Sequence, residues 1–253
     1  MKEFDKGEII VIPKIIHYIW LGGKPLPRIA ERCIESWKKF CPDYEIKRWD
    51  ESNLNLEFCD YVKEAYDCKK FAFASDVLRL QKLYEFGGIY LDVDVELIKP
   101  IDEFLDKKTF SGFETSNLLN PGLIFGTEQN NKDLKNILEL YKKRKFIVNN
   151  NMDLTTICET VTSYYEKEYD LERKNKTQIL ENISAYSSEY FSPIDVVTNK
   201  KKVTKKTVSI HWYNASWYSS KQKFLNKLKK LLNIITFGCF GKILEKIKNE
   251  KRK

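Results

Sequence analysis

The stretch FAFASDVLRLQKLYEFGGIYLDVDVELIKP, residues 71–100, decides the fold of this chain. Its first half predicts a helix over 72–86, because apolar residues recur there at helical spacing. These residues are Phe73, Val77, Leu80 and Tyr84. Gly87 and Gly88 end this helix, since glycine accepts the positive φ that a helix terminus often requires. GIYLDVD, residues 88–94, then reads as a short apolar strand that carries acids at its end.

Apolar runs alternate with helical patterns on both sides of this stretch. Strands are expected at 14–20, 44–49, 88–94, 95–98, 109–113, 122–126, 182–186 and 206–210. Helices are expected at 27–40, 56–67, 72–86, 131–145 and 153–166, with a helix start at 101–105 and a polar loop at 170–178. This alternation predicts an α/β fold, in which helices cover the faces of a sheet. Ligands bind such sheets at the carboxyl ends of the strands, where Trp20 and the Asp92–Asp94 pair would meet if both strands share one sheet.

The basic charge of the chain is concentrated at one end. The 253 residues carry a formal net charge of +8, and 42% of them are apolar, which is enough for a full core in one domain. Residues 221–253 hold eleven basic and two acidic residues, whereas the rest holds 33 basic and 34 acidic ones. The body is therefore close to neutral. We expect no nucleic acid among its partners.

The sequence also bears on location. The N-terminal residues 1–14 mix both charges and lack a long apolar run, so we expect neither a signal peptide nor a transmembrane anchor there. Six cysteines without C-x-x-C spacing are expected to be free thiols of a cytoplasmic protein. We divide the chain into a catalytic domain, 1–220, and a basic amphipathic helical tail, 221–253. That tail either lies on an anionic membrane, here the inner face of the cell membrane, or is a solvated, partly packed helix.

Asp92 and Asp94 are candidate metal ligands. Residues two apart on a strand share a face, so the two carboxylates can converge. Hard oxygen ligands at a strand end suit Mn²⁺ or Mg²⁺, which then holds a diphosphate. The alternative is a solvated turn with two acids. Glu96 has the same parity, but we expect it to face solvent.

Three further residues are candidates for holding a nucleotide. Asp76 and Arg79 lie on one helix surface, either as an ordinary surface ion pair or as a clamp. In the clamp, Asp76 accepts a hydrogen bond from a ribose hydroxyl, and Arg79 supports the phosphates or Asp76 itself. Trp20 ends a buried strand, where it either packs in the core or offers an aromatic face on which a base stacks.

The two histidines lead to different expectations. His17 lies in the middle of an apolar strand and should be a hydrogen-bonded core residue. His211, in SIHWYNASW, either packs against Trp212 or supplies a third metal ligand, a role in which imidazole suits Mn²⁺ better than Mg²⁺. In the same segment, Ser216 and Trp217 can donate hydroxyl and indole hydrogen bonds to a phosphate.

These segments together resemble one known family. IPKIIHYIWLGGKPLP (12–27), the 71–100 stretch and SIHWYNASW (209–217) are similar to the glycosyltransferases with a DXD sugar-binding region, family 32. That family includes bacterial capsule and O-antigen enzymes and yeast initiating mannosyltransferases, and clostridial glucosylating toxins are more distant relatives. The resemblance implies the GT-A fold, a Rossmann-like nucleotide-sugar-binding domain, here followed by a helical C-terminal appendage.

The resemblance also implies roles for single residues. It assigns metal binding to Asp92, Asp94 and His211, and a direct catalytic contribution to Asp92, Asp94 and Arg79. It assigns nucleotide-sugar binding to Trp20, Asn53, Ser75, Asp76, Arg79, Tyr90, Asp92, Ser216 and Trp217. No residue stands out as a nucleophile. The family mechanism therefore implies front-face displacement, in which the leaving phosphate takes the acceptor proton.

The predicted function is that of a retaining, metal-dependent hexosyltransferase. Its donor is a nucleotide sugar, with a UDP-sugar favoured, and its acceptor is a saccharide, lipid-linked in the synthesis of capsule, O-antigen or another surface polysaccharide. Two alternatives remain open. A haloacid-dehalogenase-like phosphohydrolase also places D-x-D after an apolar strand, although we find no convincing later acidic pair here. A non-catalytic nucleotide-sugar-binding protein is the second alternative.

Overall fold

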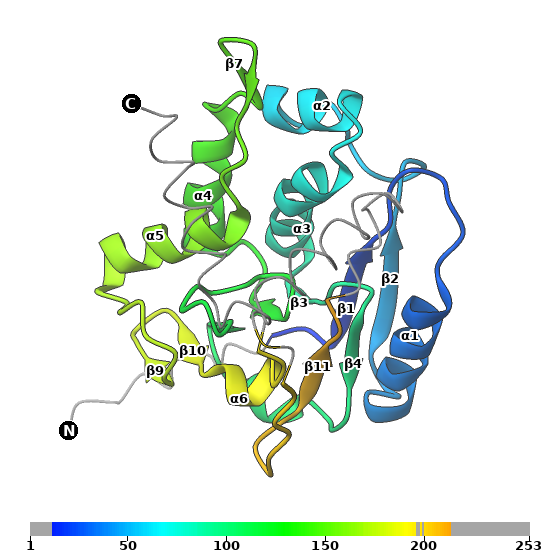
Figure 1. Cartoon of the computed structure of the whole chain (residues 1–253), viewed down its shortest axis with the longest axis vertical. Coiled ribbons are helices and arrows are strands. Elements are labelled where there is room, and N and C mark those ends of the chain that lie inside the picture. Colours follow the sequence, from blue (N-terminus) through cyan, green and yellow to red (C-terminus); the bar gives the residue numbers. More distant parts are fainter. Residues whose placement is uncertain (1–11, 196–197, 199, 214–253) are drawn as a thin grey trace, which may run out of the picture.

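A computed structural model describes residues 12–195, 198 and 200–213 of the chain. Its centre is a seven-stranded sheet in the order β2-β1-β3-β6-β5-β10-β9 (Figure 1). These strands are β1 (Ile15–Ile19), β2 (Glu45–Trp49), β3 (Gly88–Tyr90), β5 (Thr109–Gly112), β6 (Phe125–Thr127), β9 (Gln178–Ile179) and β10 (Ser184–Tyr186). Strands β6 and β9 run antiparallel to their neighbours, and the other five share one direction.

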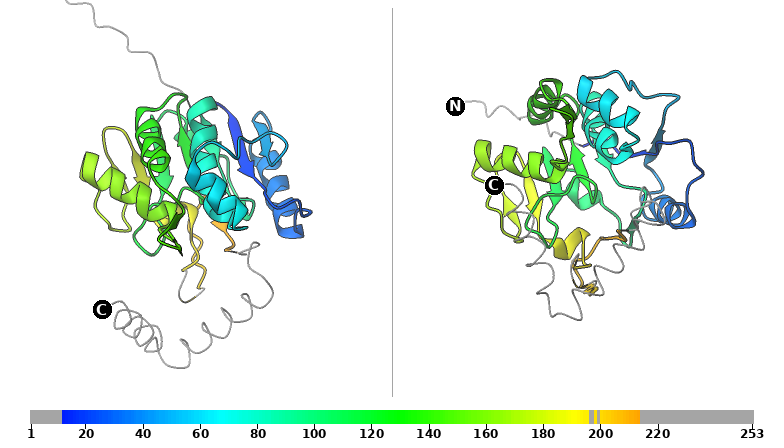
Figure 2. Two further views of the ribbon diagram at one scale, coloured as in Figure 1. Left: turned by 90° about the horizontal axis from the view of Figure 1, so that it is seen from above. Right: turned by 45° about the horizontal axis from the view of Figure 1, so that its top comes forward.

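Helices lie on both faces of this sheet. They are α1 (Arg28–Phe40), α2 (Asp60–Asp67), α3 (Phe71–Phe86), α4 (Lys132–Lys142), α5 (Ile157–Tyr169) and α6 (Ser188–Phe191), with a 3₁₀ turn at Asp102–Phe104. The right-hand view of Figure 2 shows α1 (blue) well separated from the cyan and green helices α2–α4. The α/β fold expected from the sequence is thus confirmed.

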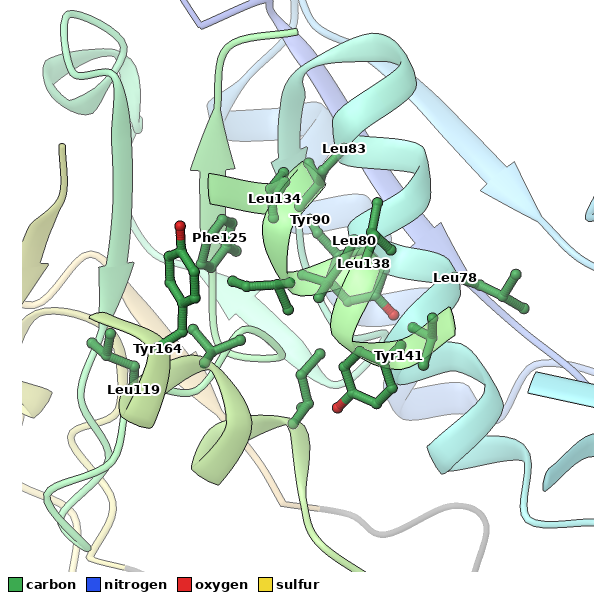
Figure 3. Packing of buried hydrophobic residues seen from close by; sticks show 14 of the residues in the cluster. Leu78, Leu80, Leu83, Tyr90, Leu119, Phe125, Leu134, Leu138, Tyr141 and Tyr164 are labelled. Carbon is green, nitrogen blue, oxygen red and sulfur yellow. The ribbon is translucent and has the colours of Figure 1, made fainter. Parts of the chain in front are cut away.

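Alternation along the strands divides the core into two clusters. On β1, Ile16 and Tyr18 belong to the cluster beneath α1, whereas Ile19 belongs to the cluster beneath α2–α5. Figure 3 shows the second cluster, where leucines of α3 and α4 surround Tyr90 of β3 and Phe125 of β6. Both faces of the central strands are therefore buried, which explains their nearly continuous apolar sequence.

The glycine pair after α3 has the predicted conformation. Gly87 and Gly88 adopt φ values of 64° and 95°, which residues with a Cβ rarely reach. A Cβ on Gly88 would also meet the Ile15 carbonyl oxygen at 2.7 Å. The pair therefore both ends α3 and lets β3 lie directly beside β1.

Two small antiparallel sheets complete the described fold. One joins β4 (Val95–Leu97) to β11 (Ser209–His211), and the other is a hairpin of β7 (Ile147–Val148) and β8 (Asn151–Met152). The hairpin was missed from the sequence, because two asparagines with positive φ form its turn and its strands are only two residues long. Helix α6 was also missed, and two expected helices begin clearly later than predicted. Helix α2 begins at Asp60 and not at 56, and α5 begins at Ile157 and not at 153, since Thr156 caps it.

Several expectations concern features outside the sheet. The tail 221–253 lies outside the described residues. Within the part of the chain that the structure describes, no helix is long and apolar enough to cross a membrane. The five cysteines in that part are free thiols, as expected: Cys33, Cys41, Cys59, Cys68 and Cys158.

His17 is the hydrogen-bonded core histidine that the sequence predicts. It is fully buried on β1, where its Nε2 lies 2.8 Å from the Gly87 carbonyl oxygen. Trp49 donates its indole hydrogen bond to His17 Nδ1 at 3.0 Å. Both contacts are satisfied by a neutral ring with its proton on Nε2. Burial accordingly lowers the pKa of His17 to about 4.

This pKa predicts a loss of stability in mild acid. Because a histidine in the unfolded chain titrates near pH 6.5, the stabilisation is complete above that pH and is lost as pH falls toward 4. We expect roughly 2 kcal/mol of this contribution to disappear between pH 7 and pH 4.5. The non-titrating variant His17→Gln should be less stable at pH 7 but should lose correspondingly less on acidification. Urea unfolding at both pH values measures this, and equal losses in both proteins would contradict it.

Candidate metal and nucleotide-sugar site

Asp92 and Asp94 lie in a turn. Strand β3 ends at Tyr90, so the strand expected over 88–94 is wrong in its second half. The Val95 N–H donates to the Asp92 carbonyl at 2.9 Å and closes the turn. The two acids are therefore brought together by this turn and not by sharing one face of a strand.

Pairing of β11 with β4 brings His211 to this turn. His211 lies opposite Val95 in the ladder, and the Trp212 N–H donates to the Asp94 carbonyl at 3.0 Å. His211 Nε2 lies 3.0 Å from Asp94 Oδ1. One ligand atom each from Asp92, Asp94 and His211 can be chosen so that all three lie within 4.8 Å of one another. The structure thus brings together the three residues predicted to bind a metal.

The chemistry of this cluster fits a divalent cation. The side chains of Asp94 and His211 are each 5% exposed, and Asp92 is 17% exposed. His211 Nδ1 is buried and has no hydrogen-bond partner among the described residues. Burial alone would lower the pKa of His211, but the charge and hydrogen bond of Asp94 outweigh it and raise that pKa. Two carboxylates with an imidazole form a ligand set that suits Mn²⁺.

Arg79 links this cluster to α3. Its guanidinium lies 2.8 Å from Asp76 Oδ1 and 3.3 Å from Asp92 Oδ1, and its side chain is only 5% exposed. The guanidinium carbon also lies 4.5 Å from the centre of the Tyr90 ring, and the Tyr90 hydroxyl donates to Asp92 at 3.2 Å. Asp76 and Arg79 are therefore a buried pair, so the alternative of an ordinary surface ion pair is wrong.

The positive charge of Arg79 does not fully offset the cost of burying the carboxylates around it. Burial raises the pKa of Asp76 to about 7, although the charge of Arg79 opposes this shift. Burial also raises the pKa of Asp92, against the charges of Arg79 and His211. With Asp94, three acids whose side chains are at most 17% exposed face one guanidinium and one imidazole. Added positive charge at this site would favour the ionised forms of these acids.

The structure places Trp20 and Ser75 at or near this edge of the sheet. Trp20 follows β1 and is half-buried, with its indole N–H donating to the Lys24 carbonyl at 2.5 Å. Since β1 and β3 are adjacent and parallel, both expected strand ends do belong to one sheet. Ser75 lies next to Asp76 on α3, where its hydroxyl donates to the Ala72 carbonyl at 2.9 Å.

The other residues predicted to contact the nucleotide sugar are not seen at this cluster in the described part of the chain. Asn53 uses its side chain within its own loop, accepting from the Asp50 N–H at 2.9 Å and donating to the Arg48 carbonyl at 3.0 Å. The structure gives it a local structural role and does not bring it into the cluster. Ser216 and Trp217 lie outside the described residues, so their expected contacts with phosphate stay predictions.

Glu96 does not face solvent freely, which corrects the expectation from its position. Its side chain is 24% exposed, and it accepts a hydrogen bond from the Trp212 indole at 2.8 Å. Arg32 of α1 approaches the same carboxylate oxygen at 3.3 Å. Glu96 therefore holds in place the residue that directly follows His211.

Sequence reasoning missed Gly122, which shapes the site. A Cβ at this position would overlap Asp92 Oδ2 and would lie 2.9 Å from Arg79 Nη1. The Gly122 carbonyl also accepts from the Asp92 N–H at 2.9 Å, and Asn120 Oδ1 accepts from the Gly122 N–H at 2.7 Å. The signal was the Asn-Pro-Gly turn at 120–122, but only the fold reveals that this turn lies against Asp92.

Comparison with known proteins agrees with the resemblance. Residues 27–111 match the family described as glycosyltransferase sugar-binding region containing DXD motif. Inositol phosphoceramide mannosyltransferase 3 of Schizosaccharomyces pombe is 34% identical over 110 residues, which are 41% of this chain and 30% of that protein. Glycosyltransferase L373 of Acanthamoeba polyphaga mimivirus is 25% identical over 199 residues, which are 75% of this chain and 76% of that protein.

One solved structure, the PaToxG glycosyltransferase, superposes with a TM-score of 0.49 at 20% identity, over 62% of this chain and 70% of that one. The chain spans about a third of the length of the fission-yeast relatives that it matches. The resemblance stated from the sequence is thus confirmed: the chain has a DXD-type sugar-binding region, and its relatives are glycosyltransferases.

The contacts of Gly122 predict that a side chain at this position disturbs the metal site. Gly122→Ala should displace Asp92 and Arg79, and so weaken Mn²⁺ binding at least about tenfold. Overpacking should also destabilise the protein by about 1–3 kcal/mol. Titration of Mn²⁺ followed by electron paramagnetic resonance measures the affinity. The control Gly23→Ala adds the same methyl group in open space, at a φ of 63°, and should lose stability without losing Mn²⁺ affinity. Wild-type affinity in Gly122→Ala would contradict the prediction.

Proposed function

We propose that this chain is a metal-dependent glycosyltransferase that moves a hexose from a nucleotide sugar to a saccharide acceptor with retention of configuration. The observation that carries the proposal is the buried cluster of Asp92, Asp94 and His211, joined through Arg79 to Asp76. The two carboxylates and the Asp76–Arg79 pair lie within the region that matches the DXD family. The proposal therefore rests on agreement between the geometry of the site and the sequence relationship.

The chemistry of the reaction explains why such a cluster is useful. Breaking a sugar–phosphate bond places negative charge on the departing diphosphate, and preorganised positive charge stabilises it. A divalent cation bound by Asp92, Asp94 and His211 would supply Lewis-acid stabilisation of that leaving group. In this proposal Arg79 orients Asp92 and supports the phosphates, while Asp76 accepts from a ribose hydroxyl. These two residues contact parts of the donor that do not react, and so contribute positioning.

The donor and the acceptor are proposed from the family resemblance and from the names of two relatives. A UDP-sugar is the favoured donor, with Trp20 stacking on the base and the leaving phosphate taking the acceptor proton. Two relatives are named inositol phosphoceramide mannosyltransferases, and this name of a lipid favours a lipid-linked acceptor here, in the synthesis of a surface polysaccharide. In the proposed arrangement, 1–220 forms the catalytic domain of a cytoplasmic protein, and 221–253 holds it on the inner face of the membrane.

Nucleotide binding that depends on metal is the first test. At about a hundred times its dissociation constant, a ligand adds roughly 2.7 kcal/mol of stability and raises the melting temperature by several degrees. We expect UDP to do so only in the presence of Mn²⁺, and GDP, CDP and ADP to have smaller effects. Asp94→Asn should abolish the response to UDP with Mn²⁺.

The outcomes of this test separate the competing functions. If no nucleotide stabilises the protein with Mn²⁺, the donor site proposed here is wrong. Release of phosphate from a phosphate monoester, together with loss of that activity in Asp92→Asn, would instead favour the phosphohydrolase. Nucleotide binding without either hydrolysis or transfer of the sugar would favour the non-catalytic binding protein.

Arg79 offers a kinetic test of positioning. Lysine carries a single ammonium and cannot bridge Asp76 and Asp92 as the planar guanidinium does. Arg79→Lys should therefore lower kcat/KM for hydrolysis of the donor sugar about a hundredfold. The control is Arg173→Lys, which changes an arginine paired with Glu159 outside the site. Loss of activity in the control alone, or equal activity in both variants, would refute this role for Arg79.

A further inference from the structure

Exposed large apolar side chains are concentrated in one segment. Seven are exposed in the part of the chain that the structure describes. Five of these seven fall between 140 and 154: Leu140, Ile147, Val148, Met152 and Leu154. The other two, Ile179 and Val203, lie elsewhere in the sequence. Single exposed apolar residues are common on protein surfaces, but a cluster of them marks a site of interaction.

The β7–β8 hairpin presents most of this cluster. Ile147 pairs with Met152 across the hairpin, and Val148 pairs with Asn151. Asn149 and Asn150 form its two-residue turn with φ values of 50° and 62°. Figure 1 shows β7 at the edge of the molecule, projecting beyond α2 and α4. The apolar side chains therefore lie on a protruding element.

The base of this hairpin is firmly held. Phe146 is fully buried and packs against the rings of Tyr61 and Phe73, with ring centres 5.4 and 5.3 Å apart. The Ile147 N–H donates to a Glu64 carboxylate oxygen of α2 at 2.8 Å. The exposure of the apolar side chains is thus a property of an anchored, folded element.

Positive charge accompanies the apolar surface. The sequence KKRK at 142–145 directly precedes the hairpin, and 139–154 contain four basic and two acidic residues. Lys142, Lys143 and Lys145 are exposed, although Lys142 pairs with Glu139 at 2.7 Å and Lys145 lies 3.7 Å from Asp60 of α2. Arg144 pairs with Asp153 at 2.6 Å. Apolar side chains beside exposed lysines match the interface of an anionic bilayer, which offers acyl chains and negative headgroups together. Exposed ion pairs such as Lys142–Glu139 and Lys145–Asp60 are weak in water, so these ammonium groups remain available to anionic headgroups, which a purely apolar protein partner does not offer.

We propose that the β7–β8 hairpin and the KKRK segment form a docking surface for an anionic membrane, separate from the tail 221–253. The surface lies near the candidate site along the chain. Leu154 precedes Ile157 by three residues, and the Ile157 backbone lies close enough to the Asp76 carboxylate to lower its pKa. Three residues span at most about 11 Å. Docking would therefore hold the site close to the membrane, where a lipid-linked acceptor is presented; this consequence alone rests on the proposed function.

Vesicle binding by the full chain tests the docking surface. The probes are vesicles of phosphatidylcholine alone, and of phosphatidylcholine with about one-third phosphatidylglycerol. We expect sedimentation with the anionic vesicles, weakened by salt. Val148→Asp with Leu154→Asp should lower the partition coefficient at least about tenfold, because charged side chains replace apolar ones at the interface. Lys143→Glu with Lys145→Glu should lower it by at least about fivefold for each lysine.

Matched variants elsewhere control for general effects of charge. Ile179→Asp with Val203→Asp introduces the same charges at the other two exposed apolar positions. Lys38→Glu with Lys39→Glu reverses two exposed lysines of α1, which Figure 1 places far from the hairpin. Both controls should bind vesicles as the wild-type protein does. Equal losses in controls and hairpin variants would overturn the proposal.

Three other results would also overturn it. These are wild-type protein that does not bind anionic vesicles, hairpin variants that bind them normally because the tail alone suffices, and equal binding to neutral vesicles. A wild-type dimer that Val148→Asp with Leu154→Asp dissociates, without vesicle binding, would identify a second copy of the chain as the occupant. The melting response to nucleotide with Mn²⁺, measured on every variant, reports the donor site independently, so failure of docking and failure of the proposed function are distinguished.

Discussion

The arrangement of the site depends on the burial of the Arg79 guanidinium. A charge removed from water in this way is tolerated only when partners satisfy it, and Asp76, Asp92 and the face of Tyr90 do so. These partners come from α3, from the end of β3 and from the turn beyond it. The position of α3 against the sheet, the glycine pair that turns the chain from α3 into β3, and the place of Asp92 are therefore mutually constrained.

Long-range strand pairing brings His211 to the turn that carries Asp92 and Asp94. His211 lies 117 residues after Asp94, and the β4–β11 ladder with the Trp212–Asp94 backbone hydrogen bond brings it there. Glu96 of β4 accepts a hydrogen bond from the Trp212 indole, and so helps to fix the segment that carries His211. The Asn120–Gly122 turn approaches from another direction and leaves no room for a side chain at Gly122. The cluster of Asp92, Asp94 and His211 thus comes from two segments that a strand ladder joins, and the tight turn at 120–122 packs against Asp92.

The sequence predicted what depends on local patterns. Helix α3 and its glycine ending follow from spacing and from φ, and the acids after β3 were found because they end an apolar run. His211 could be proposed but not placed, since only strand pairing across the chain decides its neighbours. Gly122 was missed because its importance lies in contacts with Asp92 and Arg79, which no local pattern reports. The hairpin was missed because its two-residue strands are too short to show alternation.

The excess of negative charge at the site links the stability of the fold to the binding of a cation. Three largely buried acids, Asp76, Asp92 and Asp94, share one guanidinium and one imidazole. Burial raises the pKa of Asp76 to about 7 and also raises that of Asp92. Because both values lie above those of the unfolded chain, ionising these groups opposes folding as pH rises through the native pKa values. A bound cation reverses this by favouring the ionised carboxylates, so its binding energy also stabilises the fold. A site built in this way would be stabilised most by a cation that completes its charge, and this would couple order in the turn that carries Asp92 and Asp94 to cation binding.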